Sequence, residues 1–340
     1  MARSDLIVDL GAIRRNARTL IAALEGSELW AVVKADGYGH GAVDVGAAAL
    51  GAGATALCVA TVPEGLALRA ALGSARVLVM GPATSREIAD ARDAGLELVI
   101  ADGEVPEGVR VHLKLDTGMG RWGLSELPTP GPTVVGLMTH LATADTDRNF
   151  AQEQLERFLR ATSPYAGVYV RHAANSAAAL LLSETRLDAA RCGIALYGID
   201  PFGEDPRRFD LRPALRWESD VAQVRRLAPG ESTGYGRGFV AEEATWIAIV
   251  PVGYADGFRR DLGGTDVVVQ GARSRVVGAV SMDAIAVELR GPVEVGTAVT
   301  LVGDGITLEH HARVADTIAY ELACGIRHLP GRSTRVAIDG

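Results

Sequence analysis

The chain has 340 residues, of which 48% are hydrophobic and 22% charged, and this is typical of a globular protein with one large domain or two ordinary ones. Its formal net charge of −8 argues against a nucleic acid or an acidic membrane as partner. Because the N-terminal segment lacks the apolar core of a signal peptide and no later segment has the length of a membrane span, we expect a cytoplasmic protein.

Residues 11–215 alternate short apolar runs with helical stretches. The runs are rich in Val, Leu and Ala without strict polar alternation, which is typical of strands covered on both faces. A βα alternation with about eight strands predicts an α/β fold, a closed parallel (β/α)8 barrel of the TIM type, with an open doubly wound sheet as the alternative. The predicted strands are residues 29–35, 55–60, 76–80, 96–100, 109–115, 134–140, 168–173 and 186–192.

Two connections in this region do not suit a barrel helix. Residues 101–108 read ADGEVPEG, and residues 124–133 read LSELPTPGPT with three prolines. Proline fixes φ and removes a backbone donor. We therefore expect a barrel in which two outer helices are missing.

The pattern changes after about residue 213. Strand-like runs are separated there by Gly, Pro and Asp turns, which predicts a mostly antiparallel β domain. One helical stretch, residues 308–324, interrupts it. The predicted strands are residues 215–227, 245–252, 266–270, 273–282, 284–289 and 298–303.

Cysteine and histidine spacing gives no pattern of a metal site. Cys58, Cys192 and Cys324 lack CxxC spacing and are expected to be free, mostly buried thiols. His310 and His311 are neighbours in a helical stretch, where adjacent side chains point apart, so we interpret them as a solvated pair. No bound metal is expected.

Polar side chains gather at the predicted C-terminal ends of the barrel strands, the end that carries the functional groups in a βα barrel. A single strand-end lysine is usually a solvated surface charge. The joint placement of several polar residues instead predicts a site on one face of the barrel. These residues are Lys34, Lys114, Arg121, His140, His172, Asn175, Ser176 and Arg191.

The segment AVVKADGYGHG at residues 31–41 resembles the pyridoxal-phosphate lysine motif of alanine racemases. The resemblance implies a pyridoxal-phosphate-binding barrel at residues 11–212 and a β domain made of residues 1–10 and 213–340, in which 5–10 forms a strand. It also implies a homodimer whose active sites each borrow residues from the partner's β domain. Further matching segments follow in family order at residues 112–124, 139–145, 172–178, 190–198, 233–238, 250–260, 280–283 and 317–324.

The implied activity is the interconversion of L-alanine and D-alanine with pyridoxal 5'-phosphate as cofactor, supplying D-alanine for peptidoglycan. Lys34 is expected to form a Schiff base with the cofactor aldehyde and to exchange it for the substrate amine. Hydroxyl and backbone N–H groups suit the phosphate dianion. Read without the resemblance, the segment NSAA at 175–178 is simply a helix N-cap. The other expected cofactor-binding residues are Tyr38, His140, Asn175, Ser176, Gly193, Ile194 and Tyr320.

Arg191 matches the arginine that faces the pyridine nitrogen of the cofactor. A guanidinium donates hydrogen bonds and keeps its protons, so it favours an unprotonated pyridine. The carbanion is then expected to be short-lived, which disfavours side reactions. His172 is expected to hold Arg191 from behind.

Racemisation needs a base on each face of the α-carbon. The resemblance assigns the D face to Lys34 and the L face to Tyr235 of the partner subunit. A tyrosine is a poor base at neutral pH unless nearby positive charge stabilises the phenolate. The implied chain Tyr235–His140–Arg191–His172 supplies that setting.

The resemblance also assigns residues to the substrate. Arg121 matches the arginine that reaches the substrate carboxylate and the cofactor's ring oxygen. Lys114 matches a lysine that is carbamylated in many members, and the resulting N6-carboxylysine would be an anion able to orient Arg121. Tyr254, Met282 and Asp283 of the partner subunit are expected to line the substrate pocket.

The sequence departs from the family at two kinds of position. Ala279 stands where many relatives have an arginine that lines the entry corridor, so the corridor electrostatics are expected to differ. The two shortened connections fall where the family usually has barrel helices. Neither departure removes a catalytic residue.

Three other functions remain as alternatives. A serine or broad-specificity racemase of the same fold is the nearest. A non-catalytic pyridoxal-phosphate carrier would be a single barrel, and the β-domain segments with Tyr235 count against it. A decarboxylase of this fold type needs a protonated pyridine paired with a carboxylate, and Arg191 argues against that.

Overall fold

The computed structural model describes residues 3–340, and the chain divides into two units. One unit is Gly11–Arg212, and the other combines the residues up to Leu10 with Pro213–Gly340. None of the helices in the described part of the chain combines the length and apolarity needed to cross a bilayer.

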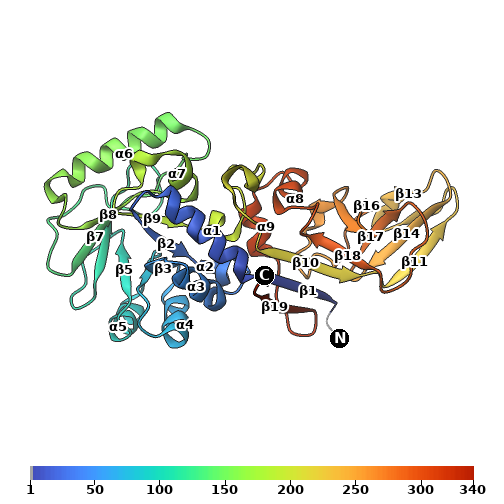
Figure 1. Cartoon of the computed structure of the whole chain (residues 1–340), viewed down its shortest axis with the longest axis horizontal. Helices are drawn as coiled ribbons and strands as arrows, with labels where there is room; N and C mark the ends of the chain where they lie inside the picture. Colours follow the sequence, from blue (N-terminus) through green and yellow to red (C-terminus); the bar gives the residue numbers. More distant parts are fainter. Residues whose placement is uncertain (1–2) are drawn as a thin grey trace. The chain divides into compact units, whose positions relative to one another are not determined.

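The first unit is a closed barrel of parallel strands (Figure 1). Its strands are β2 (Glu28–Val32), β3 (Ala56–Val59), β4 (Val77–Val79), β5 (Glu97–Ile100), β6 (Val111–Lys114), β7 (Val134–Met138), β8 (Val170–His172) and β9 (Ala189–Cys192). Every residue of β3, β4, β5 and β6 is buried, because helices cover the outer face and side chains fill the interior. The predicted barrel is confirmed, and the open doubly wound sheet is excluded.

Helices pack around part of this barrel (Figure 1). They are α1 (Leu10–Ala23), the short turn α2 (Lys34–Tyr38), α3 (Ala42–Gly51), α4 (Val62–Leu72), α5 (Ser85–Asp93), α6 (Arg148–Thr162) and α7 (Ser176–Leu181). Capping boxes begin α4 at Thr61 and α5 at Thr84, satisfying backbone donors that would otherwise lack partners. Within residues 3–340 no helix lies between β5 and β6 or between β6 and β7, as the prolines predicted.

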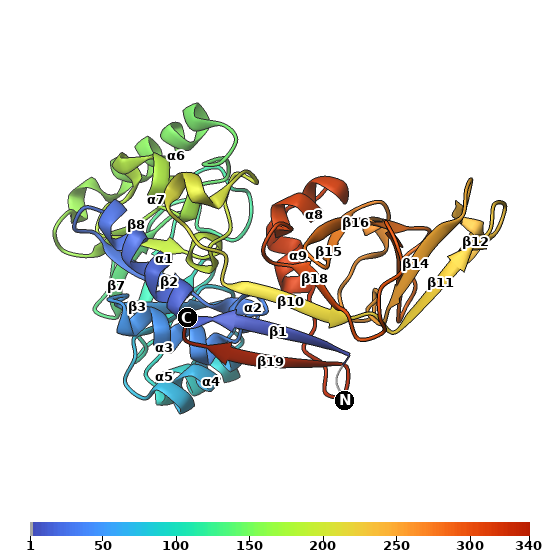
Figure 2. The ribbon, with the colours of Figure 1, turned by 45° about the vertical axis from the view of Figure 1, so that its right-hand side comes forward.

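The second unit is built on a mostly antiparallel sheet. Its strands are β1 (Ser4–Asp9), β10 (Leu215–Asp220), β11 (Gln223–Leu227), β14 (Thr245–Val250), β15 (Asp266–Val269), β16 (Ala272–Val277), β17 (Ile285–Leu289), β18 (Ala298–Val302) and β19 (Ser333–Ile338). They pair in the order β11-β14-β17-β16-β15-β18-β10-β1-β19, and β1 lies between β10 and a parallel β19 (Figure 2). A separate ribbon joins β12 (Ser232–Thr233) to β13 (Phe239–Val240). The predicted β domain is confirmed.

Three details of this unit differ from the prediction. The helix expected over 308–324 is broken into α8 (Leu308–Val314) and α9 (Ala319–Gly325), because Asp316 adopts a φ of 49° that a right-handed helix cannot contain. Strand β19 was not predicted, since four of its six residues are exposed. His311 is buried, and its ring bonds the Thr265 hydroxyl and the Leu301 carbonyl, so the solvated pair is wrong for His311.

Asn16 joins the first helix of the barrel to the segment after its last strand. Its Nδ2 donates to the Leu196 carbonyl at 3.1 Å and to the Arg212 carbonyl at 2.8 Å. Its Oδ1 accepts from the Arg212 N–H at 2.8 Å. Asn16 and Leu196 are fully buried, so no water is available to replace the bond between them.

The Asn16→Ala substitution is expected to lower the free energy of unfolding of the barrel by about 1–3 kcal/mol, because it leaves the buried Leu196 carbonyl without a partner and removes two part-buried hydrogen bonds to Arg212. Urea denaturation followed by circular dichroism measures the change. Asn149→Ala on the exposed side of α6 is the matched control and should stay within about 0.5 kcal/mol of the unmodified chain. Equal losses in the two variants would contradict the role of Asn16.

Candidate active site

A cavity opens at the C-terminal ends of the barrel strands, where the sequence predicted a site. The chain contains two lysines, Lys34 and Lys114, and both line this cavity. Arg121, His140 and Arg191 complete its charged and imidazole lining. The barrel therefore brings the only side-chain amines of the sequence to one place.

Lys34 begins a strained turn. It was expected to end the first barrel strand, but that strand ends at Val32 and Lys34 is the first residue of α2. The following residues are left-handed, with φ of 53° at Ala35, 51° at Asp36 and 52° at Tyr38. Left-handed backbone costs a residue with a Cβ about 1–2 kcal/mol. Such strain clusters at functional sites, and here it directly follows the lysine.

Two carboxylates hold this left-handed turn. Glu64 Oε1 accepts a hydrogen bond from the Ala35 N–H at 2.7 Å, and Asp36 Oδ1 accepts one from the Ala42 N–H at 3.0 Å. Glu64 Oε2 also accepts from the Thr61 N–H at 3.1 Å as part of the capping box of α4. Sequence reasoning missed Glu64, because the T-x-x-E pattern at 61–64 signals only a helix start.

A cluster of hydroxyl and N–H groups lies at the start of α7. Ser176 Oγ accepts from the N–H groups of Gly193 at 3.0 Å and Ala195 at 3.4 Å. Asn175 is the N-cap of α7, as the sequence alone suggested. A Cβ on Gly193 would lie 2.4 Å from the Tyr38 hydroxyl, so only a glycine lets the phenol approach this backbone.

Arg191, on β9, is fixed by acceptors in the barrel core. Its Nη1 donates to His172 Nδ1 at 2.6 Å and to the His172 carbonyl at 3.0 Å. Its Nη2 donates to the carbonyls of Thr139 at 2.8 Å and Ala173 at 3.2 Å, and to His140 Nδ1 at 3.3 Å. None of these partners is a carboxylate, and no residue in 3–340 accepts a hydrogen bond from Nε.

Burial sets the protonation of this group of residues. Burial and the Arg191 charge lower the pKa of His140 to about 3 and hold the pKa of His172 well below its ordinary value. Burial also lowers the pKa of Arg191 to about 10. At neutral pH both imidazoles are therefore neutral and the guanidinium remains charged.

Lys114 ends β6, and its Nζ donates to the Arg121 carbonyl at 3.1 Å. Burial, with the charges of Arg121 and Arg191, lowers the pKa of Lys114 to about 8. The loop that carries Arg121 is folded around the Asp116 carboxylate, which accepts from the three successive backbone N–H groups of residues 118–120. Asp116 is a second residue that sequence reasoning missed.

The remaining expected residues lie in the β unit. Backbone hydrogen bonds of 3.0 and 3.1 Å join the turn of Tyr254 to the turn of Met282, so these two side chains belong to one local surface. Asp283 follows Met282, and its carboxylate is paired with Arg332 at 2.9 Å. This pairing makes Asp283 part of a charged network rather than an isolated acid.

Tyr235 and Tyr320 occupy two other places in the β unit. Tyr235 stands on the loop between β12 and β13, which packs against the backbone at Ala279. Its side chain is strongly exposed, with a relative exposure of 71% for the residue. Tyr320 is the second residue of α9. The backbone of Ala279 is therefore in contact with the loop of Tyr235.

The chain matches two known domain families, described as "Alanine racemase, N-terminal domain" over residues 8–201 and "Alanine racemase, C-terminal domain" over residues 214–335. The alanine racemase of Symbiobacterium thermophilum is 41% identical, with 95% of each chain covered. That of Lactiplantibacillus plantarum is 40% identical, with 99% of this chain and 98% of the relative covered.

Solved structures agree in fold over the same length. The crystal structure of alanine racemase from E. faecalis has a TM-score of 0.90 at 36% identity. The alanine racemase from Streptomyces coelicolor has a TM-score of 0.91 at 34% identity. Each comparison covers 99% of this chain and 98% of the solved chain. The chain belongs to the alanine racemase family and is an enzyme of the amino-acid racemase class.

Proposed function

We propose that the enzyme interconverts L-alanine and D-alanine with pyridoxal 5'-phosphate as cofactor, and that the D-alanine serves peptidoglycan synthesis. The observation that carries the proposal is the cavity in which both lysines of the chain meet Arg191. Relatives that are about 40% identical are alanine racemases, which supports alanine as the substrate. When bound, the cofactor supplies an aldehyde that condenses with amines and a conjugated ring that accepts electron density.

The donor cluster at α7 fits the phosphate group of this cofactor. Ser176 and Tyr38 offer hydroxyls, and the Gly193 backbone lies against both. Neutral hydroxyl and N–H donors suit a phosphate dianion without adding fixed charge. We propose that these groups hold the phosphate together with the Ile194 N–H and the Tyr320 hydroxyl.

Arg191 fits the ring nitrogen of the cofactor. Its Nη groups are used by the barrel, whereas Nε has no acceptor within the described chain. With a pKa of about 10, the guanidinium gives up its proton in only about one molecule in a thousand at pH 7. Arg191 therefore donates a hydrogen bond without protonating the nitrogen, which limits how much negative charge the ring can take up.

Lys34 and Tyr235 are proposed to move the α-proton. Lys34 Nζ takes or returns it on the D face, and the phenol oxygen of Tyr235 of the partner subunit does so on the L face. His140 Nδ1 accepts a hydrogen bond from Arg191, so the neutral ring carries its proton on Nε2. We propose that this Nε2–H stabilises the phenolate when Tyr235 acts as the base.

Lys114 has the properties needed for carbamylation. An amine whose pKa is about 8 is neutral in about one molecule in ten at pH 7. The neutral amine adds to CO2 and releases one proton, giving N6-carboxylysine. A negative charge then replaces a positive one beside Arg121 and Arg191, which favours Arg121 as the group that binds the alanine carboxylate.

Exposed side chains on the β unit support a partner subunit. The relative exposure is 71% for Tyr235, 52% for Met282 and 38% for Tyr254. Large apolar side chains grouped on a surface mark places that partners cover. We propose a homodimer in which these side chains and Asp283 of one subunit complete the cavity of the other.

Borohydride reduction of the cofactor-loaded protein should attach the cofactor covalently to Lys34. Peptide mass mapping has two candidate lysines to distinguish, so the assignment is unambiguous. The Lys114→Arg variant keeps the Lys34 amine and should keep the label, whereas Lys34→Ala should lose it. A label on Lys114, or none at all, would refute the role of Lys34.

Exposure to 13C-labelled CO2 should give a carbamate signal from Lys114, separate from that of the α-amino group, in the 13C NMR spectrum of the cofactor-loaded enzyme. Its intensity should rise between pH 6.5 and pH 8.5, because the lowered pKa of Lys114 makes its amine neutral in this range. The signal should persist in Lys34→Ala and vanish in Lys114→Arg. A carbamate missing at pH 8.5 would speak against N6-carboxylysine.

Mixing Lys34→Ala and Tyr235→Phe chains should restore racemase activity that neither has alone. In each mixed dimer one site has both bases and the other has neither, so random pairing restores about a quarter of the activity of the unmodified enzyme. The control mixes Lys34→Ala with the double variant and should recover nothing. If verified mixed dimers stay inactive, the shared site is wrong.

A further inference from the structure

A chain of hydrogen bonds runs from Arg191 through the barrel core, away from the cavity. Arg191 Nη1 bonds His172 Nδ1 at 2.6 Å, His172 Nε2 bonds His112 Nδ1 at 2.9 Å, and His112 Nε2 bonds Glu97 Oε2 at 2.9 Å. All four residues are at most 3% exposed. His112 and Glu97 were not singled out from the sequence, and the roles described so far do not use them.

The two ends of this chain fix the direction of every hydrogen bond in it. An arginine can only donate, so His172 Nδ1 is the acceptor and the neutral His172 ring carries its proton on Nε2. That proton is donated to His112 Nδ1, which places the His112 proton on Nε2. A carboxylate can only accept, and Glu97 receives this last proton.

Glu97 also supplies a negative charge that is connected to the buried Arg191 guanidinium through the two histidines. The groups that touch the Arg191 guanidinium are carbonyls and neutral imidazoles, none of which carries a negative charge. Burial raises the pKa of Glu97, but the hydrogen bond from His112 and the charges of two arginines outweigh burial and leave its pKa below its ordinary value. Glu97 is therefore ionised at neutral pH.

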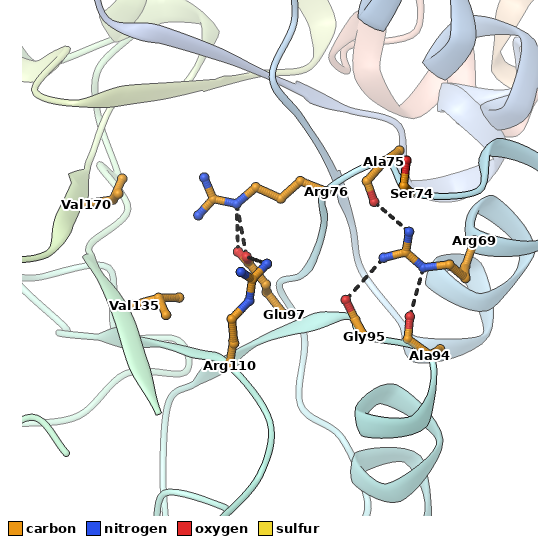
Figure 3. Close-up of a pocket in the computed structure, with 10 residues that line it drawn as sticks. All are labelled: Arg69, Ser74, Ala75, Arg76, Ala94, Gly95, Glu97, Arg110, Val135 and Val170. Atoms are coloured by element: carbon orange, nitrogen blue, oxygen red, sulfur yellow. Dashed lines mark hydrogen bonds and ion pairs between the residues drawn. The ribbon is translucent and has the colours of Figure 1, made fainter. Parts of the chain in front are cut away.

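The outer end of the chain lies in a hollow of about 690 Å³ at the N-terminal ends of the barrel strands. Figure 3 shows Arg76 and Arg110 reaching Glu97 there. Arg76 Nε lies 3.0 Å from Glu97 Oε2. These arginines hold the Glu97 carboxylate at the point where His112 meets it.

The barrel interior makes room for the two histidines. A Cβ on Gly136 would lie 2.1 Å from His112 Nδ1, so the ring occupies space that any other residue would take. The Trp30 ring packs against His172 at 4.5 Å and against His112 at 5.6 Å between centroids. Both imidazoles are therefore confined to one orientation.

We propose that Glu97 and His112 are positioning residues of the racemase site: they fix the proton arrangement of His172 and thereby hold Arg191 with its Nε free for the cofactor. This inference rests on the proposed role of Arg191 toward the pyridine nitrogen. Without an acceptor at position 97, the His112 Nε2–H is buried unpaired. Reversing the chain would bring a His172 Nδ1–H against Arg191 Nη1, donor against donor.

The test reads the ring protons directly, in the full-length chain without cofactor. Long-range 1H–15N NMR on protein with labelled histidines should show His112 and His172 neutral and protonated on Nε2. In Glu97→Gln the amide oxygen still accepts, so both tautomers should persist while the His112 Nε2 proton moves upfield. In Glu97→Leu the His112 Nε2 proton should exchange with solvent faster than in the unmodified chain. Glu153→Gln is the control, because Glu153 pairs with Arg157 on the surface of α6 and with no histidine in the described chain, and it should change neither ring.

Cofactor affinity is the second measurement. Glu97→Leu should weaken binding of pyridoxal phosphate to the apoenzyme about tenfold, as expected for one lost buried hydrogen bond, whereas Glu97→Gln should restore most of it. A His172 ring protonated on Nδ1, or an unmoved His112 proton in Glu97→Gln, would overturn the chain even if Glu97→Leu does not fold. Unchanged affinity in a folded Glu97→Leu would overturn the positioning role. Because the ring protons are read without cofactor, failure of the cofactor assignment leaves the first result intact.

Discussion

A guanidinium charge in the core of the barrel, with no carboxylate in contact, is the constraint on which the site depends. Burying such a charge is costly unless every donor is satisfied. Carbonyls at the ends of neighbouring strands and two imidazoles satisfy the Nη groups of Arg191. The same charge helps to keep His140 and His172 neutral and makes the Lys114 amine easier to deprotonate. The buried cation thus adds to the effect of burial on the protonation of the groups around it.

The strained turn after Lys34 is a second feature that fixes the geometry of the site. A lysine on a relaxed strand end would have considerable rotational freedom. Here the four residues 35–38 that follow it are left-handed, and Glu64 and Asp36 hold this turn with hydrogen bonds to the backbone. The energy stored in the turn is offset by these bonds and by the packing of the Tyr38 and Tyr197 rings, 4.9 Å apart. The lysine is presented from a rigid base, which reduces the entropy lost when its amine reacts.

The sequence was sufficient to predict the features that depend on residues close together along the chain. Apolar runs and proline placement predicted the barrel and its two missing helices, and polar residues at the strand ends predicted the cavity that Lys34, His140 and Arg191 line. Side-chain contacts that form only when the barrel closes could not be predicted from the sequence. Glu97 and His112 lie on adjacent strands, but their contact depends on which side of each strand faces inward. The left-handed turn was invisible because Ala35 and Asp36 are ordinary residues, and the break at Asp316 carries no glycine or proline signal.

The scarcity of lysine has a consequence for the chemistry of the whole chain. All the other basic residues of the 34 are arginines, which carry charge without offering a nucleophilic amine at neutral pH. An aldehyde cofactor in solution therefore meets no competing side-chain amine on the surface of this protein. In an enzyme rich in surface lysine, reagents that couple to amines react mostly at the surface. In this protein the same reagents would react with the α-amino group and with the two lysines of the cavity. Immobilising the protein through its lysines would therefore block the amines of the cavity.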